Sequence, residues 1–345
     1  MTHMWQEIGE QPDVTARCFG ENKTTIDRIV RLIRTRDIHA AVIAARGTSD
    51  HAAVYGKYVI ESLTGCKVCL SAPSIFTMYR KTVDMSDSLV IGISQSGQAE
   101  DVAAVLRSAN DQKAITVAVT NYGESPLAKL AQHHLFCAAG LEKSVAATKT
   151  FTAEMMLMAM LAAKWAGDDE LMERLRRVPG QIAETLKTAD EVEKIAQRYR
   201  FMTECFVLAR GINYSTALEM SLKIQETNYI RAKAFANSDF QHGPIAMLQK
   251  DMPVFIFAPT GASESDAEDL IGKINAAQAD LLVISDDPAV RQRGSCSLSI
   301  PGGNDDYTSP FCNVAVAQMF ACSLAVARGL NPDQPRLLHK VTKTV

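Results

Sequence analysis

Two short polar loops contain the residue types best suited to chemistry on an anion. Gly47, Thr48 and Ser49 follow one apolar run, and residues 94–97, Ser-Gln-Ser-Gly, follow another. Each loop offers hydroxyl groups and backbone N–H groups where a helix is expected to begin, and a helix dipole favours an anion such as phosphate at that end. Serine and threonine are also ordinary helix N-caps. On adjacent strands of one sheet, the two loops together predict a phosphate cradle.

Three other groups are weaker candidates from residue type alone. Glu219, Lys223 and Glu226 lie at four- and three-residue spacings on one helix face, and the plain interpretation is a solvated face with salt bridges. His242 lies in a Gln-His-Gly-Pro turn, where a histidine is more often structural or exposed than catalytic. Lys340 lies in a polar tail, where a lysine is normally solvated. These patterns by themselves identify no catalytic group.

The cysteines favour a structural role. Eight are scattered along a chain without secretory context, so we expect reduced, buried thiols, as for Cys205 and Cys322 in apolar segments. Cys66 and Cys69 form a lone C-x-x-C pair in a strand-like stretch with no second pair nearby. This isolated spacing indicates neither a metal site nor a redox pair.

The elements that must position these residues occur twice. Residues 204–211 repeat the pattern of residues 40–47, the same offset carries residues 90–97 onto 254–261, and a third apolar run recurs near that offset. In each copy a continuous apolar run precedes a small polar turn and an amphipathic helix, which is typical of strands buried in a parallel sheet. We therefore predict an α/β fold of two homologous domains, each a doubly wound parallel sheet flanked by helices.

The repeat also sets the expected boundaries. Ile26, Ile29 and Ile33 lie on one face of an N-terminal helix that should pack on the first domain. Pro179 and Gly180 are expected to break the linking segment. The expected segments are an N-terminal helical segment (1–35), a phosphate-binding domain (36–167), a linking helical segment (168–198), a second domain (199–330) and a C-terminal tail (331–345) that closes over the active site.

Composition excludes several function classes. With 345 residues, 47% hydrophobic and 22% charged, the chain is expected to fold into globular domains. Its net charge of −3 gives no reason to expect nucleic acid or an anionic membrane as a partner. The first residues lack the pattern of a signal peptide. Residues 155–163 are expected to form a buried helix, and no apolar stretch is expected to reach membrane-spanning length. A cytoplasmic location is the resulting expectation.

Taken as an ordered set, the motifs resemble one family over nearly the whole chain. The sequence is similar to the SIS (sugar isomerase) superfamily, and within it to the isomerase half of glucosamine-6-phosphate synthase and to stand-alone SIS-type glucosamine-6-phosphate deaminases. The resemblance implies two tandem SIS domains, each a flavodoxin- or Rossmann-like three-layer sandwich. The segments that carry it are residues 10–12, 47–49, 94–97, 145–149, 217–219, 241–244 and 333–336, together with Lys340.

The resemblance also implies roles for individual residues. Glu226 would move a proton between C1 and C2 of the sugar. His242 would assist ring opening, reaching in from the neighbouring subunit of a homodimer. Lys340 would contact the open-chain sugar and can form an imine with a ketose; no metal and no cofactor are implied. The residues that would bind the substrate and its phosphate are Gly47, Thr48, Ser49, Ser94, Gln95, Ser96 and Val145.

Departures from the synthase pattern bear on the choice of reaction. Ala99 stands where the synthases have a threonine near the phosphate, Gln225 replaces a lysine beside the base, and His339 replaces a small residue. We also expect no ammonia-generating glutaminase domain, because Thr2 follows Met1 where the synthase nucleophile would be a cysteine. These features favour breakdown over synthesis.

The expected function is a glucosamine-6-phosphate deaminase of amino sugar metabolism, classed as a hydrolase, that gives fructose 6-phosphate and ammonia. The alternatives on the same scaffold are a phosphosugar isomerase, a galactosamine-6-phosphate deaminase and a deglycase of sugar-phosphate adducts. A more distant alternative is a regulator that senses sugar phosphates. Such a regulator normally needs a helix-turn-helix module, for which the first 35 residues are too few and insufficiently basic.

Overall fold

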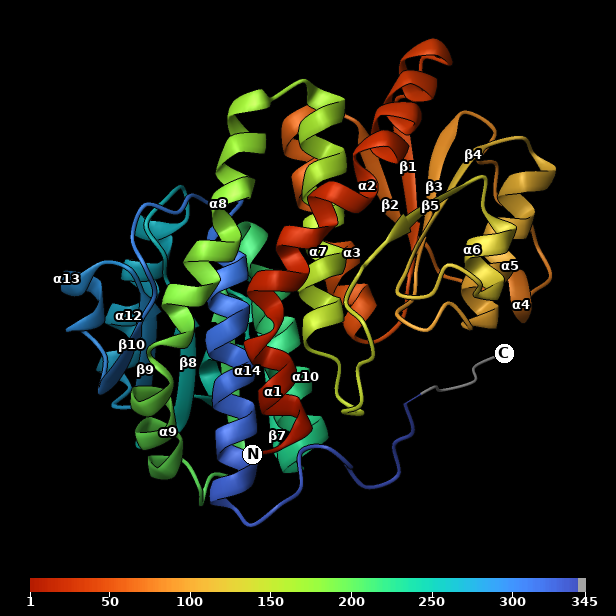
Figure 1. Ribbon diagram of the computed structural model, residues 1–345. Helices are drawn as coiled ribbons and strands as arrows, with labels where there is room; N and C mark the ends of the chain where they lie inside the picture. Colours follow the sequence, from red (N-terminus) through yellow and green to blue (C-terminus); the bar gives the residue numbers. More distant parts are fainter. Residues whose placement is uncertain (341–345) are drawn as a thin grey trace. The chain divides into compact units, whose positions relative to one another are not determined.

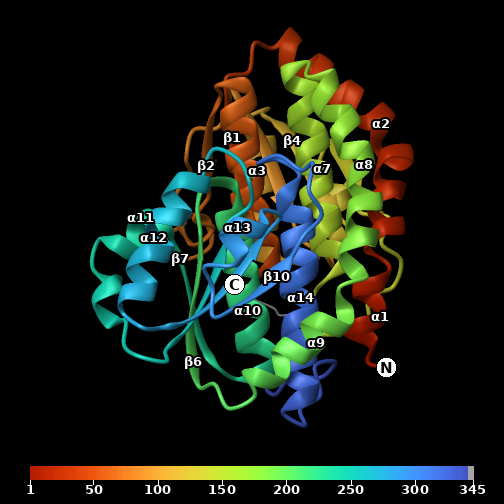
Figure 2. The same cartoon turned by 90° about the vertical axis from the view of Figure 1, so that its left-hand side faces the viewer.

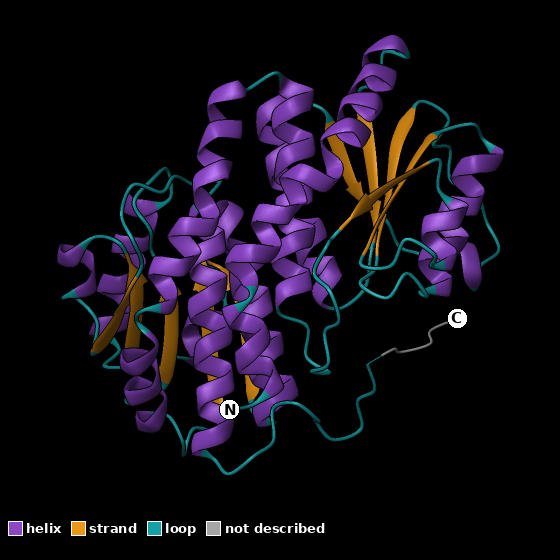
Figure 3. Cartoon of the chain, viewed as in Figure 1, coloured by secondary structure: helices purple, strands orange, loops and turns teal. Residues whose placement is uncertain are grey.

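A computed structural model describes residues 1–340, which form two compact units, each treated by itself below. Each unit is built around one five-stranded parallel sheet lying between helices (Figure 3). The N-terminal unit comprises Glu10–Glu142, Lys149–Arg177 and, among the described residues, 339–340. The C-terminal unit comprises Met1–Gly9, Lys143–Thr148 and Val178–Leu338.

The sheet of the N-terminal unit has the strand order β2-β1-β3-β4-β5. Helices α2, α3 and α7 cover one face, and α4, α5 and α6 cover the other (Figure 1). The strands are β1 (Ala40–Ala44), β2 (Lys67–Leu70), β3 (Ser88–Ile93), β4 (Ile115–Thr120) and β5 (His133–Phe136). The helices are α2 (Gln11–Thr35), α3 (Thr48–Thr64), α4 (Ser74–Thr77), α5 (Glu100–Asp111), α6 (Pro126–Leu130) and α7 (Lys149–Ala166).

The sheet of the C-terminal unit has the strand order β10-β9-β8-β6-β7. Helices α9, α10 and α14 cover one face, with α1 packed on α14, and α11, α12 and α13 cover the other (Figure 2). The strands are β6 (Glu204–Ala209), β7 (Arg231–Ala236), β8 (Pro253–Phe257), β9 (Asp280–Ser285) and β10 (Cys296–Ser299). The helices are α1 (His3–Gly9), α9 (Ala189–Arg198), α10 (Tyr214–Asn228), α11 (Asn237–Gln241), α12 (Glu264–Ala276), α13 (Pro288–Arg291) and α14 (Ser309–Ala327), with 3-10 turns η1 (Gly211–Asn213) and η2 (Pro244–Met247).

The internal repeat is confirmed at the level of topology. When the strands of each unit are counted in chain order, both sheets follow the order 2-1-3-4-5. This is the flavodoxin-like, doubly wound arrangement. Residues 94–97 follow the third strand of the first copy, because the short edge strand β2 lies between β1 and β3 along the chain.

The core follows the alternation that a buried strand requires. In β6, Cys205 and Val207 join the cluster that contains α10 and α14 residues, whereas Phe206 and Leu208 join the opposite cluster, which contains α12 residues. Strands β3 and β4 are buried along their whole length. The continuous apolar runs in the sequence therefore correctly predicted strands that are covered on both faces.

The predicted break at Pro179 and Gly180 is wrong. Helix α8 (Asp169–Leu186) runs through both residues, and the division between the two units falls inside it, after Arg177. The helix carries an apolar stripe, Leu171, Leu175, Val178 and Ile182, in which every side chain is fully buried. Packing of this stripe outweighs the one backbone hydrogen bond that a proline removes.

The expectation that no segment reaches membrane-spanning length is also wrong. Helix α14 has 19 residues and a mean hydropathy of 1.6, which is enough by length and composition. Within the structure, 89% of that helix window is buried, as in the core helix of a globular domain. Helix α7 is buried over residues 155–163, as the sequence predicted.

Most of the eight cysteines are buried free thiols, but Cys69 is exposed because it lies on the edge strand β2. Burial raises the pKa of the Cys18 thiol to about 12 and that of Cys322 to about 11. Thiols with such pKa values are protonated and unreactive near neutral pH. Within residues 1–340, no three His, Cys, Asp or Glu side chains are grouped so that they could hold a metal ion.

Candidate active site

The two polar loops lie where the strand order of the first sheet reverses. Strands β1 and β3 pair in parallel with Ala44 beside Gly92, so their carboxyl ends are neighbours. In open α/β sheets, ligands bind in the crevice at this switch point. The sequence prediction that residues 47–49 and 94–97 follow adjacent strands is confirmed.

The loop after β3 is fixed by backbone hydrogen bonds. The Ser94 N–H donates to the carbonyl of Val119 at 3.0 Å, and the Gln95 carbonyl accepts the Asn121 N–H at 3.0 Å. Gly97 has a φ of +64°, and a Cβ at this position would lie 2.1 Å from Oγ of Ser125. Glycine is therefore required, and it allows the loop to turn tightly before α5 begins.

The loop after β1 leads directly into α3. Gly47, at a φ of +56°, is the N-cap residue, and Thr48 begins the helix with an intermediate exposure. Ser49 is 8% exposed, and its hydroxyl donates to Oε1 of Glu154 on α7 at 3.0 Å. The Ser49 hydroxyl is therefore occupied by a buried carboxylate, a contact that the sequence reading did not include.

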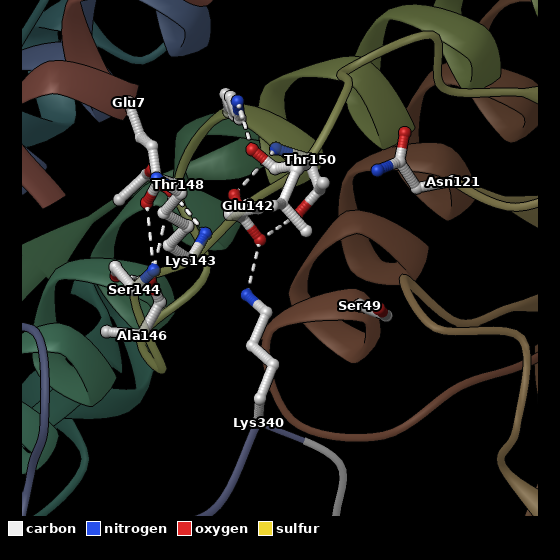
Figure 4. A network of polar contacts seen from close by, with 12 residues as sticks. Glu7, Ser49, Asn121, Glu142, Lys143, Ser144, Ala146, Thr148, Thr150 and Lys340 are labelled. Carbon is white, nitrogen blue, oxygen red and sulfur yellow. Dashed lines mark hydrogen bonds and ion pairs between the residues drawn. The ribbon is translucent and has the colours of Figure 1, made fainter. Parts of the chain in front are cut away.

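Lys340 lies against a buried acid of the N-terminal unit. Its Nζ is 2.7 Å from Oε2 of Glu142, whose side chain is fully buried (Figure 4). The same carboxylate accepts the Thr150 hydroxyl at 2.8 Å and the Thr150 N–H at 3.2 Å. Lys340 itself remains 26% exposed, so the tail places a cation at the edge of the unit.

Asn121 connects this acid to the loop after β3. Besides bonding Gln95 through its backbone, its side-chain Nδ2 donates to the Gly140 carbonyl at 2.6 Å, and its Oδ1 accepts the Ala139 N–H at 2.9 Å. Glu142 lies two residues after Gly140 in the sequence. Asn121 and Glu142 are thus structural parts of the candidate site that the sequence reading missed.

Val145 belongs to a segment that packs in the C-terminal unit. Its N–H donates to the Asp333 carbonyl at 3.1 Å, which ties the segment to the start of the C-terminal tail. The neighbouring amides of Lys143 and Ser144 donate to the Glu7 carboxylate of α1 (Figure 4). Because the Val145 N–H is already bonded, a substrate contact at this residue would have to use another group.

In the C-terminal unit, Glu219, Lys223 and Glu226 form a buried ion cluster. Lys223 Nζ lies 2.5 Å from Oε2 of Glu226 and 3.4 Å from Oε1 of Glu219. The side chains of Glu219 and Lys223 are fully buried, and that of Glu226 is 19% exposed. The plain interpretation of a solvated salt-bridged face is therefore wrong, because two of the three side chains have no contact with solvent.

Two opposing effects act on the Lys223 ammonium. Burial lowers its pKa, but the charges of Glu219 and Glu226 and hydrogen bonds to both raise it, and the net pKa lies above the ordinary value. Lys223 therefore stays protonated and holds the carboxylate of Glu226 in one position. Of the three side chains, Glu226 alone keeps contact with solvent, and a substrate could reach it.

His242 follows α11 and is exposed. Its backbone N–H donates to the Asp239 carbonyl at 3.2 Å, and its ring makes no hydrogen bond among the described residues. Within its own unit, His242 is therefore not held against Glu226. This leaves the predicted role of His242 in a neighbouring subunit as a prediction.

Comparison with known proteins identifies the family. The SIS domain model matches residues 36–164 and 203–328, so the chain belongs to the SIS domain family. A glutamine–fructose-6-phosphate aminotransferase [isomerizing] of Aquifex aeolicus is 34% identical over 340 residues. That match covers 98% of this chain and 57% of the relative, so the chain spans about half the length of the curated relatives it matches.

Two solved structures share the whole fold. A Silicibacter pomeroyi protein assigned as a phosphosugar isomerase has a TM-score of 0.88 and 30% identity, over 96% of this chain and all of that one. The glucosamine-6-phosphate deaminase of Thermotoga maritima has a TM-score of 0.83 and 21% identity, over 99% of this chain and all of that one. At that identity, the likeness to the deaminase shows the fold alone.

The comparisons correct one expectation about the reaction class. We expected the chain to be classed as a hydrolase, but the curated relatives are named as isomerising aminotransferases. These names refer to an isomerising transfer of an amino group and not to hydrolysis. The expected keyword hydrolase is therefore wrong as the class name, because these relatives are named for their isomerising step.

Proposed function

We propose that the chain is an isomerising glucosamine-6-phosphate deaminase, which converts the substrate and water to fructose 6-phosphate and ammonia. After ring opening, Glu226 removes the proton from C2 and delivers it to C1. A second proton passes from the C2 amine to O1 through solvent, so the 2-amino aldehyde becomes a 2-imine with a hydroxyl group on C1. Water then adds at C2 and ammonia leaves. The proton transfer needs one positioned carboxylate, and no metal is part of the proposal.

The observation that carries this proposal is the Lys223–Glu226 contact. A carboxylate that shuttles a proton must be fixed in position and accessible. Glu226 meets the first need through a 2.5 Å contact with a fully buried, protonated lysine. Its 19% exposure meets the second.

The remaining predicted roles divide between the two units. Residues 47–49 and 94–97 of the N-terminal unit would bind the phosphate, and Lys340 would contact the open-chain sugar. Holding the phosphate far from C1 fixes the sugar chain and lowers the entropic part of the barrier. His242 is proposed to reach a neighbouring subunit, which agrees with its exposure in a single chain.

A second candidate is plain phosphosugar isomerisation. It is favoured by the likeness to the Silicibacter pomeroyi protein, which matches over its full length. Both reactions use the same proton transfer by Glu226, and they differ only in whether an amine leaves from C2. The choice between them is therefore a question of substrate.

One assay distinguishes these candidates. Purified protein is incubated with glucosamine 6-phosphate, galactosamine 6-phosphate and glucose 6-phosphate, and ammonia and ketose 6-phosphate are both quantified. We expect ammonia and fructose 6-phosphate in equal amounts from glucosamine 6-phosphate. Ketose formation from glucose 6-phosphate without ammonia release from either amino sugar would instead select the isomerase.

The matched control is a second Glu→Gln change in the same unit. Glu226→Gln should lower turnover at least about 100-fold, because general acid–base groups contribute about 10²- to 10⁴-fold. Glu191→Gln removes the same charge from an exposed position on α9 and should leave turnover unchanged. Equal activity of the Glu226→Gln variant and the wild type would exclude the proposed proton transfer.

A further inference from the structure

An arginine beside the first polar loop is not among the residues to which a role has been assigned so far. Arg46 immediately precedes Gly47, in the loop after β1. Its Nε lies 2.7 Å from Oδ2 of Asp101, which is in the first turn of α5. One ion pair therefore connects the loop after β1 to the helix that follows the loop of residues 94–97.

The two partners of this ion pair differ in exposure. The Asp101 side chain is 3% exposed, whereas that of Arg46 is 47% exposed. Among the described residues, Nε is the nitrogen of the Arg46 side chain that forms a hydrogen bond. Both terminal nitrogens therefore keep their N–H donors for a ligand. A guanidinium with two such nitrogens matches the spacing of two phosphoryl oxygens.

The local charge favours a cation at this position if an anion binds. The first turns of α3 and α5 contain Asp50, Glu100 and Asp101, whose carboxylates would repel a phosphate, and of these Glu100 already pairs with Arg107. Burial raises the pKa of the Asp50 carboxyl, and the positive charges of His51 and Arg46 oppose that rise. Arg46 thus acts on carboxylates of both helices, at the ends that face the two loops.

The N-terminus of α5 also lacks a side-chain hydroxyl that could donate to a phosphate. Its N-cap residue is Ala99, which makes no side-chain capping hydrogen bond. A phosphate at this helix end would find backbone N–H groups but no hydroxyl from residue 99. The terminal nitrogens of Arg46, held close to the first turn by Asp101, can supply the missing donors.

We propose that Arg46 is a substrate-binding residue, whose terminal nitrogens contact the phosphoryl group while Nε stays on Asp101. Asp101 is then a positioning residue for Arg46. The proposal rests on the proposed function in one respect only, namely that the two loops hold the phosphate of a sugar phosphate. It does not depend on which reaction follows.

The first test measures binding without turnover. Dissociation constants for fructose 6-phosphate and inorganic phosphate are measured by calorimetry for the wild type, Arg46→Gln and Arg46→Lys. We expect Arg46→Gln to weaken both about 10- to 100-fold, as for the loss of a charged hydrogen bond. Arg46→Lys should recover part of the affinity, because it restores the charge but not the two-nitrogen geometry.

The matched control removes an arginine of similar exposure that, like Arg46, pairs with an acid in the first turn of α5. Arg107 of α5 pairs with Glu100 and is 49% exposed. Arg107→Gln should bind both phosphates as the wild type does. If Arg107→Gln and Arg46→Gln weaken binding equally, the effect is general electrostatics and the proposal fails.

A double variant separates contact with phosphate from neutralisation of Asp101. If Arg46 only cancels the charge of Asp101, the Arg46→Gln/Asp101→Asn variant should bind as tightly as the wild type, and this result would overturn the proposal. Direct contact instead predicts that the double variant binds as weakly as Arg46→Gln. Circular dichroism and thermal unfolding check that each variant is folded, and the conservative Arg46→Lys variant provides the same comparison if Arg46→Gln does not fold.

The outcomes for this inference and for the proposed function are separable. Arg46-dependent binding together with an absence of ammonia release keeps the inference and rejects the deaminase. Unchanged binding by Arg46→Gln rejects the inference whether or not ammonia is released. Failure of the wild type to bind either phosphate also rejects it. In the active enzyme we expect a raised KM with little change in kcat, as for a group that binds substrate and transition state equally.

Discussion

At the scale of single residues, Lys223 determines what Glu226 can do. Removing one partner from a buried ion pair leaves an uncompensated charge in a medium that solvates it poorly. Lys223 has two acidic partners, so the loss of Glu226 still leaves it paired with Glu219. The loss of Lys223, in contrast, leaves both acids without their shared cation.

This difference gives a prediction for stability. Lys223→Met should lower the free energy of unfolding by about 3–5 kcal/mol, whereas Glu226→Gln should lower it by much less. Because folding raises the pKa of Lys223, its contribution is present below the ordinary lysine pKa and is lost as pH rises through the folded-state pKa. Urea unfolding of both variants at neutral pH measures the difference.

The same two variants separate structure from catalysis. Both should lose turnover, since Lys223 holds the carboxylate that moves the proton. If Glu226→Gln proves as destabilising as Lys223→Met, the main role of Glu226 is structural. A destabilisation confined to Lys223→Met supports the catalytic assignment.

The sequence could predict the spacing of these residues but not their burial. Glu219, Lys223 and Glu226 would share a helix face in either a solvated or a buried helix. Burial depends instead on tertiary packing, as where Cys312, Val316 and Phe320 of α14 share one core cluster with Met220 and Ile224 of α10. Contacts between segments so far apart in the sequence leave no signal in the local pattern.

At the scale of elements, the C-terminal tail is held at several points before it reaches Lys340. The Asp333 carboxylate accepts the N–H groups of His3 and Met4 at 2.9 and 2.8 Å, and so caps the start of α1. The Arg336 guanidinium lies 3.8 Å from the centre of the Tyr229 ring, and the backbone N–H of Arg336 donates to the Tyr229 hydroxyl at 3.0 Å. These contacts fix where the chain enters its last segment.

Deleting the chain from Leu337 onward should therefore remove activity while both units stay folded. Leu337 and Leu338 are exposed, so the deletion removes little buried apolar area. It also removes the contact of Lys340 with Glu142. Turnover and near-ultraviolet circular dichroism measure the two effects.

The point variant Lys340→Met is the control for that deletion. If Lys340 is the functional part of the tail, the point variant and the deletion should lose the same activity and show similar thermal unfolding. Full activity of the deletion variant would remove Lys340 from the mechanism. The part of the tail from residue 341 onward lies outside the described residues.

Elements were predicted well where the signal was local. Apolar runs located β1, β3, β4, β6, β8 and β9, and the polar loops fell at the strand ends as expected. Pro179 was misread because the local rule against proline in a helix competes with the buried stripe around it. Glu142 was missed because its partner, Lys340, is nearly two hundred residues away in the sequence.

At the scale of the whole molecule, the two copies have kept one topology but diverged in chemistry. In the first copy, residues 94–97 provide two serines and a glutamine after the third strand, and the equivalent loop of the second copy, residues 259–261, is Pro-Thr-Gly. The ion cluster of Glu219, Lys223 and Glu226 belongs to the second copy. Neither copy alone contains all of the proposed catalytic parts.

The exposed position of His242 gives a prediction for assembly. If His242 completes the site of a neighbouring subunit, the protein is a homodimer, and sedimentation should find the active form as a dimer. Mixing subunits of the inactive variants Glu226→Gln and His242→Ala should then restore about a quarter of the wild-type activity, because about half of the dimers are hybrids and each has one complete site.

The mixture also has a clear negative outcome. A histidine that serves its own chain gives no recovery on mixing, since every site then lacks one of the two residues. A fully active monomer would equally contradict the prediction. Remixing each variant with itself is the control for the exchange procedure.

The continuity of α8 has a consequence for how the two copies are inherited. The chain passes from one unit to the other inside a hydrogen-bonded helix, with buried side chains on both sides of the junction at Arg177. A split of the gene at this point would cut a helical turn and leave two new frayed ends, each exposing part of an apolar stripe. Selection should therefore keep both halves on one polypeptide, even as the functional residues of the two copies diverge.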